Sequence, residues 1–328
     1  MNILCSERGA QELAEAGLLR RWPGRVALVG IARAAQADTV FLTRDVVWPS
    51  TDDWLTPATA AFYEAMLAAP RLRWVHTYAS GADRRIYGDL RARGVEVTNS
   101  AGANAGAVAQ TALAGFLYFT RQLHAARRQQ LARRWQPMAH DEIKALRRTE
   151  AMVVGWGEIG RRIGGYLSAL GVSLRVLRQS GEPVPGAAAA GDYGRFHEWV
   201  GQIDWVFFAC PLSPSTRGLF GMRTLDALRI DRPLGIVNVA RGPLIDTEAL
   251  LAAHQRGLVR HAHLDVFDTE PLPQDHPLWR CEDFLLTPHM AGSSDGNREE
   301  VVDRFLALLA RRMEAGGTQA SAGPVRPA

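Results

Sequence analysis

Residues 151–160, Ala-Met-Val-Val-Gly-Trp-Gly-Glu-Ile-Gly, decide the fold class of this chain. An apolar run leads into a G-x-G-x-x-G pattern, and a helical pattern follows over residues 158–170. The segment therefore predicts a strand, a tight turn and a helix in succession. Such a unit binds the pyrophosphate of a dinucleotide, because the anion is favoured at the positive N-terminus of the helix.

Each glycine of the motif has an expected task. Gly155 makes the tight turn, Gly157 lets the backbone approach the pyrophosphate, and Gly160 allows close packing of the helix on the strand. The candidate cofactor contacts from this segment are Gly155, Trp156, Gly157, Glu158, Ile159 and Gly160.

Short apolar runs alternate with helical patterns on both sides of this unit, which predicts a parallel α/β architecture. Strands are expected at 26–30, 39–42, 72–78 and 95–98, and then at 151–155, 173–177, 205–209, 234–239, 261–266 and 284–286. Helices are expected at 57–69, 104–134, 158–170 and 247–256. Residues 180–194 are expected to form a loop, and those after 316 a disordered tail.

The length of 328 residues is more than one core usually supports, so two domains are predicted. The fold class is two Rossmann-like parallel-sheet domains. Residues 102–287 are expected to form a dinucleotide-binding domain, inserted into a smaller flavodoxin-like substrate domain. That smaller domain would consist of residues 1–101 and 288–328, and a helix over 295–309 would complete its sheet.

Composition excludes several classes of protein. The three cysteines, Cys5, Cys210 and Cys281, have no CxxC spacing, so neither a disulfide framework nor a zinc site is indicated. The chain does not open with a signal peptide, and a reducing cytoplasm is the expected location. The uncharged stretch 97–120 is interrupted by polar residues and glycines, so a buried loop and helix are favoured over a membrane span.

Charge gives no reason to expect a nucleic-acid partner. The net charge is +4, but the basic residues lie on expected helix faces without a nucleic-acid-binding fold. His261 and His263 are two apart on a strand, a spacing that can bind metal. The sequence suggests no further ligand near them, so they are taken as packing or surface residues and no metal is predicted.

The second strand of the nucleotide unit ends in Arg178-Gln179-Ser180, and the first carboxylate after it is Glu182. An NAD-binding unit usually has an acidic residue here to bind the ribose 2′-OH. Arg178 and Ser180 suit a 2′-phosphate instead, with Gln179 between them. NADP is therefore the first choice of cofactor. The alternative is that Arg178 is only a solvated residue and NAD is used.

Three segments of the C-terminal half make the reading specific: Asn-Val-Ala-Arg-Gly at 238–242, Leu-Asp-Val-Phe-Asp-Thr-Glu-Pro-Leu-Pro at 264–273, and Thr-Pro-His at 287–289. With the glycine motif, they make the chain resemble the D-isomer-specific 2-hydroxyacid dehydrogenase family, from about residue 26 to 309. The resemblance implies NAD(P)H-dependent reduction of a small 2-oxo acid to the D-2-hydroxy acid. Residues 178–180 resemble the glyoxylate/hydroxypyruvate reductase branch.

The resemblance implies a catalytic role for Arg241, Glu270 and His289. The Arg241 guanidinium would hold the substrate carboxylate and polarise the 2-oxo group. His289 would give a proton to the carbonyl oxygen as hydride arrives at C2. Glu270 would pair with His289 and favour its protonated form.

The resemblance also implies further binding residues. On the cofactor side they are Cys210, Pro211, Thr216, Val239, Ala240, Arg241, Asp265 and His289. On the substrate side they are Ala79, Ser80 and Gly81, with Arg241 and His289. Ala79 stands where the family has glycine. Asp265 is left with two readings, a position near the nicotinamide or a cap at the end of a strand.

Two other functions share this fold. Corepressors that bind NAD(H) and partner peptides resemble the chain as well, but only a short tail follows residue 316, which favours an enzyme. A phosphite or formate substrate is the third reading. The resemblance would place a lysine in the substrate loop, and the only lysine, Lys144, lies far from residues 78–83 in sequence. The expected partners are a small 2-oxo or 2-hydroxy acid and a second copy of the chain in a homodimer.

Overall fold

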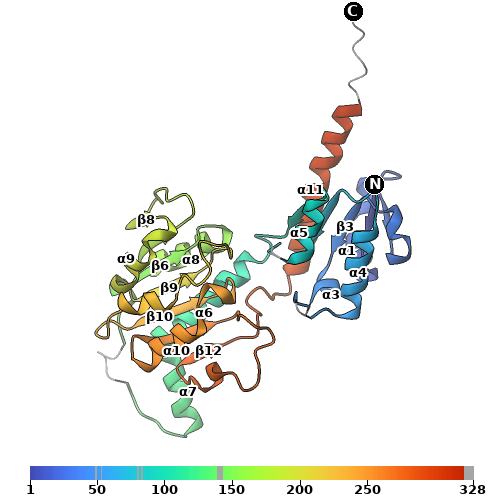
Figure 1. Ribbon diagram of the computed structural model, residues 1–328. Coiled ribbons are helices and arrows are strands. Elements are labelled where there is room, and N and C mark those ends of the chain that lie inside the picture. Colours follow the sequence, from blue (N-terminus) through green and yellow to red (C-terminus); the bar gives the residue numbers. More distant parts are fainter. Residues whose placement is uncertain (49, 53, 80, 83, 139–142, 321–328) are drawn as a thin grey trace, which may run out of the picture. The chain divides into compact units, whose positions relative to one another are not determined.

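The computed structural model describes residues 1–48, 50–52, 54–79, 81–82, 84–138 and 143–320, with the side chains of 315–320 left out. The chain divides into two units. Unit 1 consists of Met1–Asn104 and Ser294–Ala328, and unit 2 of Ala105–Ser293. In Figure 1, unit 1 is the blue part of the chain with the red C-terminal helix, and unit 2 runs from green to orange.

Unit 1 contains a parallel sheet with the strand order β2-β1-β3-β4-β5. Its strands are β1 (Asn2–Leu4), β2 (Ala27–Val29), β3 (Thr39–Leu42), β4 (Trp74–Thr77) and β5 (Glu96–Asn99). Its α-helices are α1 (Glu7–Glu15), α2 (Leu18–Arg21), α3 (Arg44–Val47), α4 (Pro57–Ala68), α5 (Arg85–Ala92) and α11 (Asn297–Ala320). The sequence analysis did not predict β1, because three residues are too few to establish an alternating pattern.

The C-terminal helix α11 belongs to the core of unit 1. Its apolar face packs on the sheet, where the ring of Phe305 stacks 4.5 Å from that of Phe41 and 5.1 Å from that of Trp74. The buried members of this face are Val301, Val302, Phe305, Leu306 and Leu309. Helix α11 therefore covers the sheet that the N-terminal part of the chain forms. A disordered tail was expected after residue 316. For residues 317–320 that prediction is wrong, because α11 extends to Ala320.

Unit 2 contains a parallel sheet with the order β12-β11-β10-β9-β6-β7-β8. Its strands are β6 (Glu150–Val154), β7 (Ser173–Leu177), β8 (Ala189–Gly191), β9 (Trp205–Phe208), β10 (Leu234–Asn238), β11 (Val259–Leu264) and β12 (Phe284–Leu286). Its α-helices are α6 (Ala105–Thr120), α7 (Leu123–Leu131), α8 (Glu158–Ala169), α9 (Phe196–Trp199) and α10 (Thr247–Gln255). Separate apolar clusters cover the two faces of this sheet, so β9 and β10 are buried throughout.

The two parallel sheets confirm the predicted fold class, with two differences in unit 2. The predicted loop over 180–194 contains β8, whose three small residues pair with Arg175–Leu177 and carry no β-branched signal. The single helix expected over 104–134 is divided into α6 and α7, because Gln122 has a left-handed φ of 58°. Within the described residues, no helix is long and apolar enough to span a membrane.

Candidate active site

The glycine motif forms the turn from β6 into α8. Gly155 has a φ of 103°, and an added Cβ would lie 2.5 Å from the amide nitrogen of Cys210. A Cβ at Gly160 would lie 1.9 Å from the carbonyl oxygen of Gly155, so α8 approaches the turn more closely than a side chain allows. Gly157 is the N-cap of α8, and a Cβ there would meet no atom of the described residues within 4 Å. The N-terminus of α8 is thus open to a ligand.

A cavity of about 430 Å³ lies beside this turn. It is lined by Gly155, Trp156, Gly157, Arg178, Gln179, Ser180, Tyr193, Ala209 and Pro211. The fold therefore brings the turn after β6 and the end of β7 to one cavity, as a dinucleotide would need. The Trp156 indole packs over Gly164, where a Cβ would lie 2.4 Å from Cη2.

Ten of the predicted cofactor residues do not line this cavity: Glu158, Ile159, Gly160, Cys210, Thr216, Val239, Ala240, Arg241, Asp265 and His289. Glu158, Ile159 and Gly160 lie in the first turn of α8. Cys210 and Thr216 are buried near the cavity.

Burial raises the pKa of the Cys210 thiol to about 12, so the thiol stays protonated. The Thr216 hydroxyl donates to the carbonyl of Pro211 at 2.8 Å and accepts from the Ser213 N–H at 2.8 Å. Thr216 therefore shapes the turn that carries Pro211.

An acidic side chain already contacts the two side chains expected to bind a 2′-phosphate, Arg178 and Ser180. Glu182 Oε2 lies 3.4 Å from Arg178 Nη2 and accepts a hydrogen bond from Ser180 Oγ at 3.2 Å. In the sequence, Glu182 was noted only as the first carboxylate after Arg178-Gln179-Ser180. In the fold it is an intramolecular anion at the place where a ligand phosphate is expected.

The second group of predicted residues lies beyond the carboxyl ends of β10, β11 and β12. Glu270 Oε2 and His289 Nδ1 are 2.6 Å apart, and Glu270 Oε1 accepts the N–H of Phe267 at 2.9 Å. Burial raises the pKa of Glu270, but the hydrogen bond and charge of His289, the Phe267 N–H and the Arg241 charge together hold it below its ordinary value. Glu270 is thus a carboxylate at neutral pH and accepts a hydrogen bond from His289 Nδ1.

The turn that carries His289 is held by Asp265, at the end of β11. The buried Asp265 carboxylate accepts from the Thr287 hydroxyl at 2.5 Å and from the N–H groups of Met290 and Ala291, each at 2.9 Å. Its own carbonyl accepts the His289 N–H at 2.8 Å. His289 has a φ of 49°, which a residue other than glycine adopts only where the surroundings fix it. The sequence left two roles open for Asp265, a position near the nicotinamide and a cap at the end of a strand. The hydrogen bonds above show that its carboxylate anchors the turn that follows β12.

Arg241 follows β10, with Val239 and Ala240 buried before it. Its Nη1 donates to the carbonyl of Ala240 at 2.7 Å. Asn238 bridges the same turn, since its Nδ2 donates to the Arg241 carbonyl at 3.0 Å and its Oδ1 accepts the Ala240 N–H at 3.1 Å. Sequence reasoning gave Asn238 no role, although an asparagine that ends a strand is a common turn signal.

The expected substrate loop belongs to unit 1. Ala79 and Gly81 follow β4, and Ser80 lies outside the described residues. The Ala79 N–H donates to Thr77 Oγ1 at 3.3 Å, and its carbonyl accepts the Ser100 N–H at 3.1 Å. Their role in substrate binding stays a prediction.

Comparison with known proteins now adds to this geometry. Residues 113–291 match the family described as D-isomer specific 2-hydroxyacid dehydrogenase, NAD binding domain. A glyoxylate reductase of Thermofilum pendens is 31% identical over 262 residues, which are 77% of this chain and 74% of that relative. The chain belongs to the D-isomer specific 2-hydroxyacid dehydrogenase family. Unit 2, which holds the matched segment, is therefore the nicotinamide-cofactor unit of an oxidoreductase.

Other members of the family are similar in different degrees. A D-3-phosphoglycerate dehydrogenase of Mycobacterium leprae is 32% identical over 72% of this chain, but the match spans only 44% of that relative. Among solved structures, a family protein of Aeromonas salmonicida has a TM-score of 0.77 at 22% identity, covering 96% of both chains. A family protein of Xanthobacter autotrophicus, solved with NADPH and MES, has a TM-score of 0.73 at 25% identity over 96% of this chain and 95% of that one.

Proposed function

We propose that the chain reduces a small 2-oxo acid of the glyoxylate or hydroxypyruvate type to the D-2-hydroxy acid, with NADPH as the reductant. The observation that carries this proposal is the 2.6 Å contact between Glu270 and His289, with the Arg241 charge close enough to act on Glu270. One acid, one supporting carboxylate and one guanidinium are the set that carbonyl reduction next to a carboxylate requires. Family members named glyoxylate reductase, about 31% identical, support the substrate class.

The nicotinamide, when bound, supplies the hydride that reduces the 2-oxo carbon. The side chains prepare the substrate for that step. Arg241 binds the substrate carboxylate and draws electron density from the neighbouring carbonyl. His289, protonated and held by Glu270, gives the proton that the carbonyl oxygen needs as it gains negative charge. In the oxidative direction the neutral imidazole takes that proton back, and Glu270 stabilises the imidazolium that forms.

The residues around the 430 Å³ cavity fit a dinucleotide with a 2′-phosphate. The pyrophosphate would be held at the N-terminus of α8 by the backbone after Gly157. Arg178 and Ser180 would hold the 2′-phosphate once Glu182 turns away from them. The solved relative that binds NADPH supports this choice, and use of NADH is the alternative to be measured.

The test is oxidation of NADPH and NADH by the purified chain against a panel of 2-oxo acids, followed at the absorbance of the reduced nicotinamide. We expect turnover with glyoxylate or hydroxypyruvate that His289→Ala abolishes. Normal cofactor binding without turnover of any 2-oxo acid would overturn the proposal and favour a regulatory protein. Turnover only with a larger 2-oxo acid would leave the reaction class in place and correct the substrate.

We further propose that the chain is a homodimer that works in the cytoplasm. Leu123, Leu131 and Trp135, on and after α7, are large apolar residues exposed in the single chain, which supports burial against a second copy. Light scattering on the wild type should give twice the chain mass, and Leu131→Glu should give the single mass. A wild-type monomer would refute the dimer.

A further inference from the structure

Three possible metal ligands meet at the end of the unit 2 sheet opposite Asp265 and His289. They are His124 at the start of α7, His261 near the start of β11, and Asp283 directly before β12. Ala262 of β11 pairs with Phe284 of β12. His261 and Asp283 directly precede these two paired residues, so they are neighbours across the sheet. One nitrogen of each imidazole and one carboxylate oxygen all lie within 4.8 Å of one another.

The two histidines carry buried ring atoms that lack a partner. Nδ1 of His124 and Nδ1 of His261 have no hydrogen-bond partner among the described residues. A bound water or ion is one way to satisfy a buried polar atom of this kind. Each ring also contacts a backbone group, that of Tyr118 for His124 and that of Asp283 for His261.

The rings are held in place by an aromatic neighbour. Phe119 stacks on His261 with ring centroids 4.6 Å apart and an interplanar angle of 12°, and its ring lies 5.2 Å from that of His124. The ring centroids of the two imidazoles are 4.8 Å apart, and the rings meet edge to face. The ligand atoms are therefore preorganised by packing.

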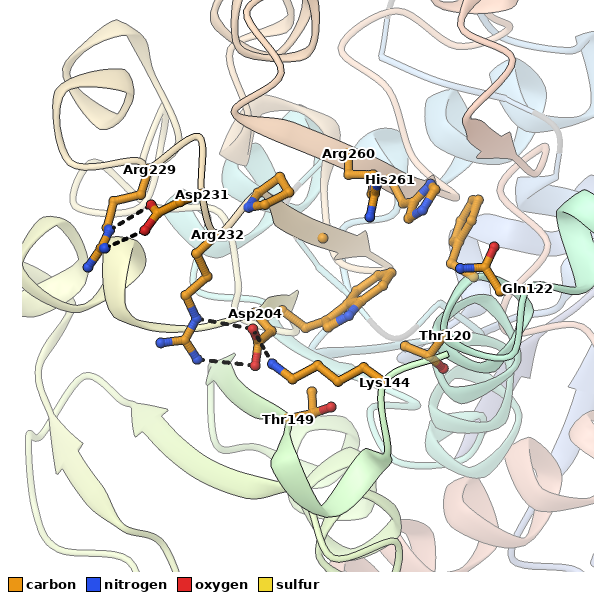
Figure 2. Close-up of a pocket in the computed structure, with 14 residues that line it drawn as sticks. Thr120, Gln122, Lys144, Thr149, Asp204, Arg229, Asp231, Arg232, Arg260 and His261 are labelled. Atoms are coloured by element: carbon orange, nitrogen blue, oxygen red, sulfur yellow. Dashed lines mark hydrogen bonds and ion pairs between the residues drawn. The ribbon is translucent and has the colours of Figure 1, made fainter. Parts of the chain in front are cut away.

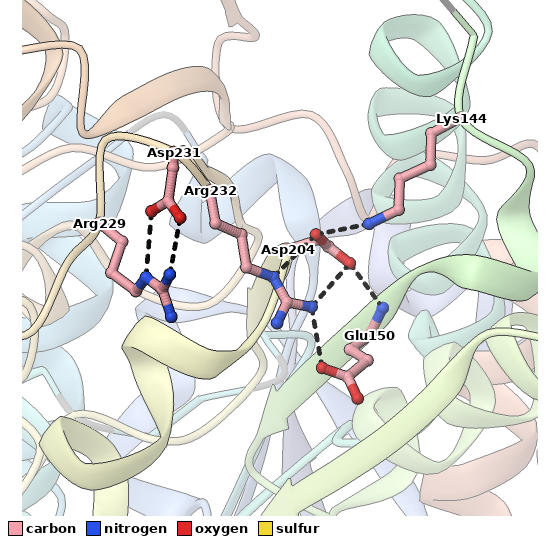
Figure 3. Close-up of polar contacts among 6 residues, drawn as sticks. All are labelled: Lys144, Glu150, Asp204, Arg229, Asp231 and Arg232. Atoms are coloured by element: carbon pink, nitrogen blue, oxygen red, sulfur yellow. Dashed lines mark hydrogen bonds and ion pairs between the residues drawn. The ribbon is translucent and has the colours of Figure 1, made fainter. Parts of the chain in front are cut away.

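A polar cavity of about 530 Å³ adjoins the cluster, and His261 lies on its wall beside Arg260 (Figure 2). Most of its basic side chains are already paired. Lys144 and Arg232 contact Asp204 at 2.7 and 3.0 Å, and Arg229 contacts Asp231 at 2.6 Å (Figure 3). These pairs neutralise much of the positive charge that would repel a metal ion.

We propose that His124, His261 and Asp283 form a site for a divalent transition-metal ion of the zinc type, which clamps α7 to β11 and to the edge strand β12. Two imidazoles and a carboxylate, with a fourth position open to water, are a common zinc ligand set. Ligands of tetrahedral zinc lie roughly 3.4 Å apart, so the three groups must close by about an ångström. Asp283 is partly exposed and can supply that movement.

Arg128 opposes the metal, because its Nη1 lies 3.4 Å from an oxygen of Asp283. Both partners of that pair are well exposed, so its loss costs little.

Equilibrium dialysis of the purified full chain against Zn²⁺, with metal counted by mass spectrometry, tests the site. We expect one zinc ion per chain. His124→Gln and Asp283→Asn should each weaken binding at least about tenfold. Arg128→Gln should strengthen binding, because the competing cation for Asp283 is gone. The control is His197→Gln, which changes a half-buried histidine elsewhere in unit 2 and should leave the affinity unchanged.

Thermal unfolding gives a second readout that is independent of turnover. Zinc should raise the Tm of the wild type and of His197→Gln, and should not raise that of Asp283→Asn. Asp283 is partly exposed, so its variant is expected to fold even if His124→Gln does not. Absence of bound zinc in the wild type, or equal affinity in wild type and Asp283→Asn, would overturn the proposal.

Discussion

The contact between Arg178 and Glu182 makes cofactor choice the sharpest test of the proposed function. The two side chains are 3.4 Å apart, with 32% of Arg178 and 68% of Glu182 exposed. A bound 2′-phosphate would take the place of the Glu182 carboxylate against Arg178 and Ser180. The perturbation is therefore a pair of variants, one that removes the cation and one that removes the competing anion.

The two variants should differ in sign and in size. A hydrogen bond to a charged group contributes about 1.5–3 kcal/mol, so Arg178→Gln should lower kcat/KM for NADPH roughly 10- to 150-fold. An exposed ion pair is worth only about 0.2–1 kcal/mol, so Glu182→Gln should raise kcat/KM for NADPH about 1.5- to 5-fold. Neither change removes a contact expected with NADH, whose kcat/KM should stay nearly constant.

The assay is initial-rate kinetics with each cofactor at a saturating 2-oxo acid, with glyoxylate as the first choice. Arg175→Gln is the matched control, because Arg175 lies on the same strand but contacts Gln202. Its ratio of NADPH to NADH efficiency should equal that of the wild type. An unchanged ratio in Arg178→Gln, or equal use of both cofactors by the wild type, would refute the assignment of Arg178 and Ser180 to a 2′-phosphate.

Four further outcomes are expected. His289→Ala should lower kcat roughly 10²- to 10⁴-fold while NADPH affinity, measured by fluorescence titration, stays nearly constant; full activity would remove the proton-donor role. Glu270→Gln should lower kcat for 2-oxo acid reduction, because the carboxylate that holds His289 through Nδ1 is lost; an unchanged kcat in a folded variant would contradict the pairing. The pKa of Glu270 in the folded protein is held below its ordinary value of about 4.3. Its carboxylate therefore stabilises the fold above that pH, and this stabilisation is lost as the pH falls through the pKa of the folded protein. In urea unfolding, the difference in stability between wild type and Glu270→Gln should be larger at pH 7 than at pH 3. Gly160→Ala should lower the free energy of unfolding by about 1–3 kcal/mol, whereas Gly157→Ala should leave it unchanged and weaken cofactor binding; equal stability of the two would mean that α8 can shift to relieve the clash.

The residue pattern predicted those parts of this protein that depend on residues close together in the chain. The spacing of Gly155, Gly157 and Gly160 after an apolar run predicted the turn from β6 into α8, because a tight turn and a close helix approach need glycine at fixed intervals. The alternation of apolar runs and helical patterns predicted the parallel sheets for the same local reason. Two short strands, β1 and β8, were missed, since three residues carry too little pattern.

Which side chains far apart in sequence come into contact depends on how the whole chain folds. Glu270 and His289 are 19 residues apart in sequence, yet they come within 2.6 Å because β11 and β12 are neighbours whose loops leave the same edge of the sheet. The same pairing of strands lets Asp265 anchor the His289 turn. Such contacts depend on strand register and on the path of each loop, and those are set by packing across the whole sheet rather than by residue spacing.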